Sequence, residues 1–197
     1  SRRTLKPNFK ILIIYNMNRD KNIDIEALEL AQAGHANGIS TYLRDAIKDG
    51  KHSLTDEQKL AIIEEATVHY GKFLTALGVD WENDPNSSNT PRRVAKAYVN
   101  DLWKGRYEGL SAVTSFPSDG YDGVVFEGGI PITSMCSHHH QTINGLCHIA
   151  YVPTLEGRVV GLSKLNRIVE HFSRRGAIQE QLTVAIHNAV DKICEGN

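Results

Sequence analysis

The sequence has little of what marks several classes of protein. It holds three cysteines among 197 residues, an odd number with no disulfide framework, which favours a reducing, cytoplasmic compartment. No apolar run approaches the length of a membrane span, and the start lacks the apolar segment of a signal peptide. The net charge of -1 gives no argument for binding nucleic acid or a membrane surface. We therefore expect a cytoplasmic protein that has neither as a partner.

The length and an ordinary apolar fraction of 41% fit one domain with an N-terminal extension. We place the extension at residues 1–52 and the main domain at 53–197. Residues 9–15 form an apolar run of strand length, which is either a buried strand or a segment that packs on a partner subunit. Short helices are expected at 23–32 and 41–48, so the extension is predicted to be partly helical.

The clearest helix is predicted over residues 55–77, where apolar residues recur at steps of three and four and share one face. Ser53, or Thr55 paired with Gln58, can cap its start. Gly78 can close its end.

A second helix is predicted to run to Gly105, with Thr90 as its N-cap and Pro91 as its first helical residue. Basic residues near its start are unusual, because the helix dipole disfavours cations there. One interpretation is that Arg93 or Lys96 contacts an anion. The other is that both lie on an ordinary solvated helix face. The helix by itself leaves the two interpretations open.

Potential metal ligands gather between two β-segments at the centre of the chain. A thiol and three imidazoles fall within five positions: Cys136, His138, His139 and His140. Thiolate sulfur and imidazole nitrogen are the side-chain ligands that zinc prefers. Neighbouring side chains alternate faces along a strand, so a site that uses both Cys136 and His139 requires a bend in the chain. A run of surface histidines without a metal is the other interpretation.

The segment after the cluster predicts a hairpin and then a helix. Asn144–Gly145 is a strong turn signal between β-branched residues, so we expect the turn there. Ser163 can cap a helix on which Lys164 and Arg167 share a face. Such a helix N-terminus suits phosphate, although an ordinary charged helix face explains the same residues.

An apolar stripe predicts a last helix, in whose first turn lie Gln179 and Glu180. A carboxylate at a helix start suits the helix dipole, so Glu180 has a structural explanation that needs no ligand. Helices come first, β-segments lie in the middle and helices come last. This order indicates the α+β class.

Five segments, in this order, closely resemble GTP cyclohydrolase I, and the resemblance covers about residues 55–194. The segments are Thr90-Pro91-x-Arg93-Val94-Ala95-Lys96, Ile132-Thr133-Ser134-Met135-Cys136-x-His138-His139, Ala150-Tyr151-Val152-Pro153, Gly161-Leu162-Ser163-Lys164-Leu165-Asn166-Arg167-Ile168-Val169 and Gln179-Glu180-x-Leu182.

The resemblance implies the tunnelling fold, an antiparallel four-stranded sheet with helices packed on one face. It also implies a homodecamer of two face-to-face pentamers, with active sites at subunit interfaces. Members of the family are zinc hydrolases that convert GTP and water to 7,8-dihydroneopterin triphosphate and formate. The product can feed tetrahydrofolate, biopterin or 7-deazaguanine synthesis, and the sequence does not choose among them.

The resemblance also implies roles for individual residues. The zinc ligands are Cys136 and His139, with His138 as the proton-transferring group. The triphosphate contacts are Lys96, Ser163, Lys164 and Arg167. The guanine readers are Gln179 and Glu180, whose carboxylate accepts from the ring N–H and the amino group.

Two positions of the cluster depart from the family motif, which is Cys-Glu-His-His followed by an aromatic residue. Ser137 replaces the glutamate, and His140 replaces the aromatic residue. Because partners of metal ligands tune metal sites, the loss of the carboxylate is expected to alter ligand orientation.

The family continues past the last helix into a hairpin whose His-x-Cys segment supplies a third zinc ligand. This sequence ends at Asn197, where that segment should begin, and it starts at Ser1 rather than at Met. We expect the sequence to have been cut. A natural truncation, or a substitute ligand such as Cys147 or Cys194, would explain the same ending.

Other functions remain open beside the zinc hydrolase. The first is a catalytically inactive, purine- or pterin-binding ring subunit that lacks the last zinc ligand. The second is a related tunnelling-fold enzyme, such as a pterin synthase or a deazaguanine reductase, although neither group's own motif is matched. A free-standing zinc-binding module is disfavoured, because only half of a four-ligand pattern is present.

Overall fold

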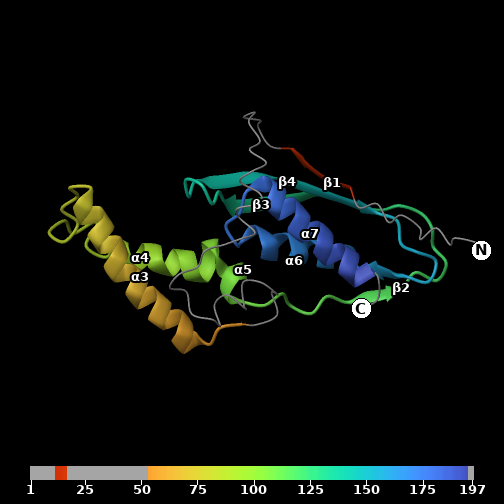
Figure 1. Cartoon of the computed structure of the whole chain (residues 1–197), viewed down its shortest axis with the longest axis horizontal. Helices are drawn as coiled ribbons and strands as arrows, with labels where there is room; N and C mark the ends of the chain where they lie inside the picture. Colours follow the sequence, from red (N-terminus) through yellow and green to blue (C-terminus); the bar gives the residue numbers. More distant parts are fainter. Residues whose placement is uncertain (1–11, 17–52, 195–197) are drawn as a thin grey trace, which may run out of the picture.

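The computed structural model describes residues 12–16 and 53–194 (Figure 1). The described helices are α3 (Asp56–Ala76), α4 (Thr90–Ala97), the π-helix η1 (Tyr98–Leu102), α5 (Lys104–Tyr107), α6 (Leu162–Ser173) and α7 (Gln179–Cys194). The described strands are β1 (Leu12–Asn16), β2 (Ser115–Pro117), β3 (Val125–Met135), β4 (Thr142–Tyr151) and β5 (Arg158–Val160). This order confirms the α+β class.

The main sheet of the described residues is antiparallel, with strand order β1-β4-β3. Strands β2 and β5 pair separately. Strand β1 overlaps the apolar run at 9–15, so part of that run is a strand at the sheet edge. The helices expected at 23–32 and 41–48 lie outside the described residues. A fourth strand in the main sheet and an N-terminal helical region stay predictions.

Helices α6 and α7 lie together on one face of the main sheet (Figure 1). Their apolar stripes interlock with the inward residues of β3 and β4, and the best-buried of these side chains have no exposed surface. They include Ile149, Leu165, Ile168, Ile186 and Val190. This core confirms the expected packing of helices on one face, and we call it, with its sheet, the sheet unit.

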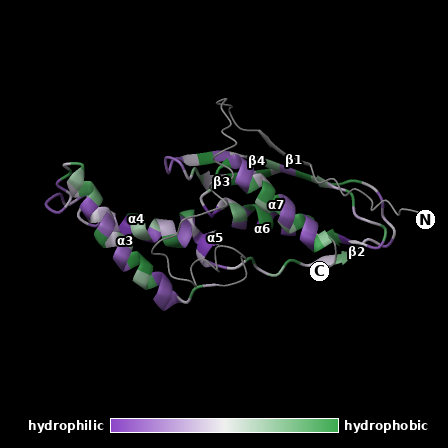
Figure 2. Ribbon diagram, viewed as in Figure 1, coloured by the Kyte–Doolittle hydropathy of each residue, from purple (hydrophilic) through white to green (hydrophobic). Residues whose placement is uncertain are grey.

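Helices α3, α4, η1 and α5 form a second unit, which extends from the sheet unit and which we call the helical arm (Figure 1). Its core is small and is made of Leu54, Ile63, Ala95, Val99 and Tyr107. Figure 2 shows hydrophobic and hydrophilic residues interspersed along α3, and several of its apolar side chains are exposed. Among the described residues, no helix combines the length and the apolar character of a membrane span.

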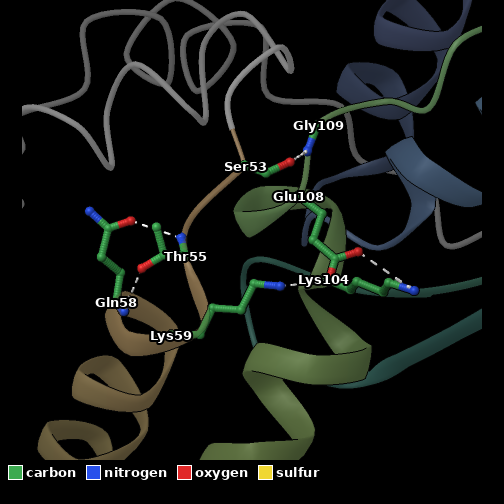
Figure 3. A network of polar contacts seen from close by, with 7 residues as sticks. All are labelled: Ser53, Thr55, Gln58, Lys59, Lys104, Glu108 and Gly109. Atoms are coloured by element: carbon green, nitrogen blue, oxygen red, sulfur yellow. Dashed lines mark hydrogen bonds and ion pairs between the residues drawn. The ribbon is translucent and has the colours of Figure 1, made fainter.

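The start of the arm has the cap that the sequence predicts. The hydroxyl of Thr55 accepts from the backbone N–H of Gln58, whose side chain accepts from the N–H of Thr55 in return. Ser53 has another role, since its hydroxyl accepts from the N–H of Gly109 at 2.9 Å. Figure 3 shows these contacts beside an ion pair of Lys59 with Glu108 at 2.8 Å, which ties α3 to the end of α5. Capping and long-range contacts therefore fix this helix start together.

The N-caps predicted at Thr90 and Ser163 are wrong, unlike the cap at Thr55. Helix α4 begins at Thr90 itself, and the cap position belongs to Asn89 without a side-chain hydrogen bond. Helix α6 begins at Leu162, and Gly161 occupies the extended cap position with φ -60° and ψ 135°. Ser163 therefore lies in the first helical turn, where its hydroxyl is free to meet a ligand instead of capping the helix.

The predicted helix end at Gly105 is also wrong, because Gly105 lies inside α5. A Cβ at this position would lie 2.1 Å from the carbonyl oxygen of His171 on α6. The N–H of Gly105 donates to the carbonyl of Arg174 at 2.9 Å. Glycine here permits a close approach between the arm and the sheet unit rather than ending a helix.

Candidate functional site

The Cys/His cluster forms the turn between β3 and β4. The N–H of Cys136 donates to the carbonyl of Gln141, and the N–H of His140 donates to the carbonyl of Cys136, both at 2.9 Å. The turn predicted at Asn144–Gly145 is wrong, since both residues lie inside β4 opposite Thr133 and Ile132. The bend that a site using Cys136 and His139 requires is therefore present, and we call residues 136–141 the Cys/His turn.

The buried face of the sheet explains this register. Ile130 lies opposite Cys147, and Ile130, Ile132 and Ile149 all face the core. A shift of one residue would move these side chains to the open face, so burial of the apolar set decides where the chain turns. His140 takes the left-handed conformation that the turn needs, with φ 53°, and histidine is among the residues that tolerate it.

The turn presents its donors toward solvent. Cys136 is half-buried, whereas His138 and His139 are exposed, with ring centroids 6.1 Å apart and ring planes inclined by 75°. Thiol and imidazole donors fit zinc in kind. Within residues 53–194, no group of three or more His, Cys, Asp or Glu side chains is arranged to hold a metal. The described part of the chain thus offers the donors of this turn as part of a metal site.

Neither of the other cysteines can serve as a substitute ligand in the same chain. Cys147 is fully buried and lies five residues along β4 from Thr142, about 17 Å from the turn at the usual strand rise. Cys194 is buried at the end of α7, and burial raises the pKa of its thiol to about 12. Its neighbour Tyr151 pairs with Val125 at the opposite end of the sheet.

The residues expected to read guanine lie near the turn. Gln179 and Glu180 open α7 and are half-buried. The loop before them is joined to the end of β3, because the N–H of Ala177 donates to the carbonyl of Met135 at 3.2 Å. Met135 immediately precedes Cys136. The structure therefore brings the Cys/His turn and the start of α7 to the same end of the sheet.

The residues expected to bind triphosphate begin at the other end. Ser163 and Lys164 follow Val160, whose N–H donates to the hydroxyl of Tyr151 at 2.8 Å. Tyr151 lies nine residues along β4 from Thr142, about 30 Å from the turn. Helix α6 runs back toward the turn over about 18 Å. Within one chain, the structure does not bring Ser163 and Lys164 to the Cys/His turn.

The two remaining cations expected at the triphosphate lie elsewhere. Lys96 is exposed on α4 in the helical arm. Arg167 lines a cavity of about 250 Å³ between α5 and α6, together with Glu108 and His171. Burial and Arg175 lower the pKa of His171 to about 4, against the opposite effect of Glu108. The imidazole in this cavity is therefore neutral at neutral pH.

Comparison with known proteins gives the chain its relatives. The family model for GTP cyclohydrolase I matches residues 66–197, which include the Cys/His turn, α6 and the start of α7. The chain is 39% identical over 163 residues to the GTP cyclohydrolase 1 of Aeromonas hydrophila, which is 82% of this chain and 69% of the relative. It is 34% identical over 163 residues to the protein of the same name from Tolumonas auensis, covering 82% and 70%.

The chain belongs to the GTP cyclohydrolase I family. A third relative, the GTP cyclohydrolase 1 of Shewanella denitrificans, is 37% identical over 147 residues, 74% of this chain and 64% of that protein. The resemblance drawn from the five sequence segments is thus confirmed at the level of the family, which is a family of enzymes.

Sequence reasoning missed two residues that border the site of this family member. Tyr98 is the first residue of η1 and Trp103 directly follows its end, and both contact the ring of His140. The sequence offered one signal for this contact: a histidine stands at position 140, where the family has an aromatic residue. The partners of His140 could not be read from the sequence, because they lie about forty residues away in the chain.

Proposed function

We propose that this chain is a zinc-dependent GTP cyclohydrolase that converts GTP and water to 7,8-dihydroneopterin triphosphate and formate. One observation carries the proposal: the Cys/His turn lies beside the first turn of α7, through the hydrogen bond between Ala177 and Met135. Potential metal donors and potential purine readers thus share one end of the sheet. Family membership supports the same reaction.

The hydrolytic end of the site consists of Cys136, His138 and His139. Cys136 and His139 would hold zinc, which when bound lowers the pKa of a water molecule to about 7 and so supplies hydroxide near neutral pH. His138 lies exposed between them in sequence and is free to deliver a proton to the purine ring nitrogen as the imidazole ring of guanine opens. Ser137 offers no carboxylate to orient these groups.

The binding end of the site consists of groups matched to the two ends of GTP. Glu180 can accept from the N–H and the amino group of guanine, and Gln179 supplies an amide beside it. Ser163, Lys164 and the first backbone N–H groups of α6 suit the triphosphate, because a helix N-terminus and cations both favour anions. The further cations for this role are Arg167 and Lys96.

We also propose that each site is shared between copies of the chain. The Cys/His turn and the start of α6 lie at opposite ends of one subunit, so a head-to-tail neighbour is required to bring Lys164 to Glu180. Repetition of one heterologous contact closes a ring when the rotation between neighbours divides a full turn evenly. A decamer of two pentamers in the cytoplasm is the assembly that we propose. Three cysteines, none of them in a disulfide, are compatible with that compartment.

GTP turnover with added zinc tests the proposal, in the 197-residue chain and in a chain extended past Asn197 by the His-x-Cys segment of the family, because the Cys/His turn alone leaves the zinc site short of a ligand. Formate release and the fluorescence of oxidised neopterin are measured for the wild type and for Cys136→Ser and Glu180→Gln, with a chelator control. In the extended chain we expect chelator-sensitive turnover that falls at least a hundredfold in each variant, the size of effect expected when a metal ligand or a polar contact to the substrate is lost. His69→Asn is the matched control, because His69 is exposed on α3 and should leave turnover unchanged.

Absence of turnover in both chains, with GTP binding retained, would replace this function with that of an inactive purine-binding ring subunit. Absence of both turnover and binding would contradict both functions.

A further inference from the structure

The Cys/His turn is contacted by an aromatic pair from the helical arm. The hydroxyl of Tyr98 lies 3.2 Å from Nδ1 of His140, within hydrogen-bond distance. The ring of Trp103 meets the His140 ring edge to face, with centroids 5.4 Å apart and planes at 73°. Tyr98 and Trp103 also contact each other, at 4.8 Å and 79°. Three rings, two from the helical arm and one from the sheet unit, therefore meet beside the Cys/His turn.

The π-helical geometry of η1 makes this pair possible. The N–H of Trp103 donates to the carbonyl of Tyr98, five residues earlier, at 2.8 Å. In a regular α-helix, residues five apart point about 140° away from each other. The wider π turn places both rings on the same side, and such turns are frequent at functional sites.

Trp103 touches the second part of the site as well. Gly176, with φ 66°, lies so close that a Cβ there would be 2.5 Å from Nε1 of Trp103. The next residue is Ala177, which is hydrogen-bonded to Met135 at the end of β3. The guanidinium of Arg106 covers the indole ring at 4.8 Å and fixes its orientation from the arm. One indole thus lies against the Cys/His turn and against the loop that opens α7.

We propose that Tyr98 and Trp103 are positioning residues, which hold the Cys/His turn and the start of α7 in a fixed relation. Tyr98 acts through His140, and Trp103 acts through His140 and Gly176. The consequence for catalysis rests on the proposed function, whereas the effect on the order of the turn does not. Because His140 closes the turn through its N–H, an unfixed His140 ring loosens the segment that carries Cys136 and His139.

The first variant is Tyr98→Phe, which removes the hydroxyl and keeps the ring. We expect the amides of Cys136 and His140 to exchange hydrogen about 2- to 12-fold faster, the effect of one lost hydrogen bond. Tyr121→Phe is the matched control, because it also removes a tyrosine hydroxyl, one that donates to the carbonyl of Val124 just before the start of β3, at the end of that strand far from the turn. It should leave exchange in the turn unchanged.

Metal binding and kinetics separate positioning from ordinary packing. Co²⁺ is titrated as a spectroscopic probe, since its thiolate absorption band reports on Cys136. We expect Tyr98→Phe to weaken Co²⁺ binding about tenfold, as is typical for changes behind a metal ligand, and to lower kcat with little change in KM for GTP. A merely structural residue would leave this band and the split between kcat and KM unchanged.

A double-mutant cycle tests the contact itself. His140→Asn removes the imidazole and tolerates the left-handed conformation as histidine does, so adding Tyr98→Phe to it should accelerate exchange no further. Trp103→Phe should also accelerate hydrogen exchange at Ala177, because the smaller ring no longer contacts Gly176. Additive effects, or unchanged exchange at Cys136 and His140 in folded Tyr98→Phe, would overturn the inference.

The hydrogen-exchange, Co²⁺-binding and turnover measurements together distinguish this inference from the proposed function. A wild type that binds no Co²⁺ and turns over no GTP contradicts the function, while the exchange comparison still decides the role of Tyr98. A fully active wild type with an unchanged turn in Tyr98→Phe contradicts the positioning role alone.

Discussion

The sheet unit and the helical arm are stabilised to different degrees. In the sheet unit, Ile149, Leu165 and Ile186 have no exposed surface. In the arm, the five core residues keep between 2% and 7% of their surface exposed, and Phe73 on α3 and Leu77 just after it are more than half exposed. The sheet unit therefore has the larger and better enclosed core, whereas the core of the arm is small. The proposed site lies at the junction of the two units and draws on both.

The largest effects are expected from the two cores. Ile186→Ala should lower the free energy of unfolding by about 4 kcal/mol, because a fully enclosed site cannot collapse around the cavity. Ile63→Ala in the arm should cost about 2 kcal/mol, since its surroundings are looser. Urea denaturation measures both. Equal losses in the two variants would mean that the units do not differ in this way.

The junction itself is tested at Gly105. A Cβ there would lie 2.1 Å from the backbone oxygen of His171, so Gly105→Ala should cost about 2–3 kcal/mol and increase hydrogen exchange throughout the arm. Gly161→Ala is the matched control, because its Cβ would meet nothing closer than 3.7 Å. A stability loss in the control that equals the loss in Gly105→Ala would contradict the role of the close approach.

The cavity between the units makes stability depend on pH. Burial and Arg175 lower the pKa of His171 from 6.5 to about 4, with Glu108 opposing them. Below about pH 6.5 the unfolded chain binds a proton that the folded chain does not, so stability falls as pH decreases toward 4. Because solvent reaches part of the ring, we expect a loss of about 1–2 kcal/mol between about pH 7 and pH 5.

Urea midpoints of the wild type and of His171→Gln at these two pH values measure this effect. The variant should lose clearly less stability than the wild type. An equal loss in both would assign the pH dependence to other groups.

Thiol reactivity is the mildest probe, since it changes no residue. Cys136 is half-buried in the turn, whereas Cys147 and Cys194 are buried in the sheet unit. Iodoacetamide should label Cys136 in the native protein, and label all three thiols only after unfolding. Mass spectrometry of the labelled peptides identifies the sites. Native labelling at Cys194 would show that the sheet unit opens as readily as the turn.

The comparison of the two units also shows what the sequence could predict. Helices α3 and α7 follow from apolar periodicity and the Thr55–Gln58 cap, because these signals are local. The turn at Asn144–Gly145 was predicted from an equally local signal and is wrong. The pairing of Ile130 with Cys147 across the sheet overrides that signal. These two residues are too far apart in sequence for any short segment to reveal their pairing.

The site shows the same limit. The proposed ligand residues could be named because the motif is contiguous, and the five segments identify the family. Their arrangement could not be predicted, because the distance between Lys164 and Cys136 depends on which end of the sheet each element reaches. The contact of Tyr98 with His140 joins two units through a π-helix, a geometry without a sequence signature.

Subunit complementation tests the central claim, a hydrolytic site shared between copies of the chain. Cys136→Ser and Lys164→Ala chains, each inactive alone, are unfolded together, refolded with zinc and assayed for formate release beside refolded wild type. The account predicts recovery of about a quarter of the wild-type rate, the share of interfaces at which both contributing ends are intact. No recovery, with mixed oligomers formed, would contradict a shared site.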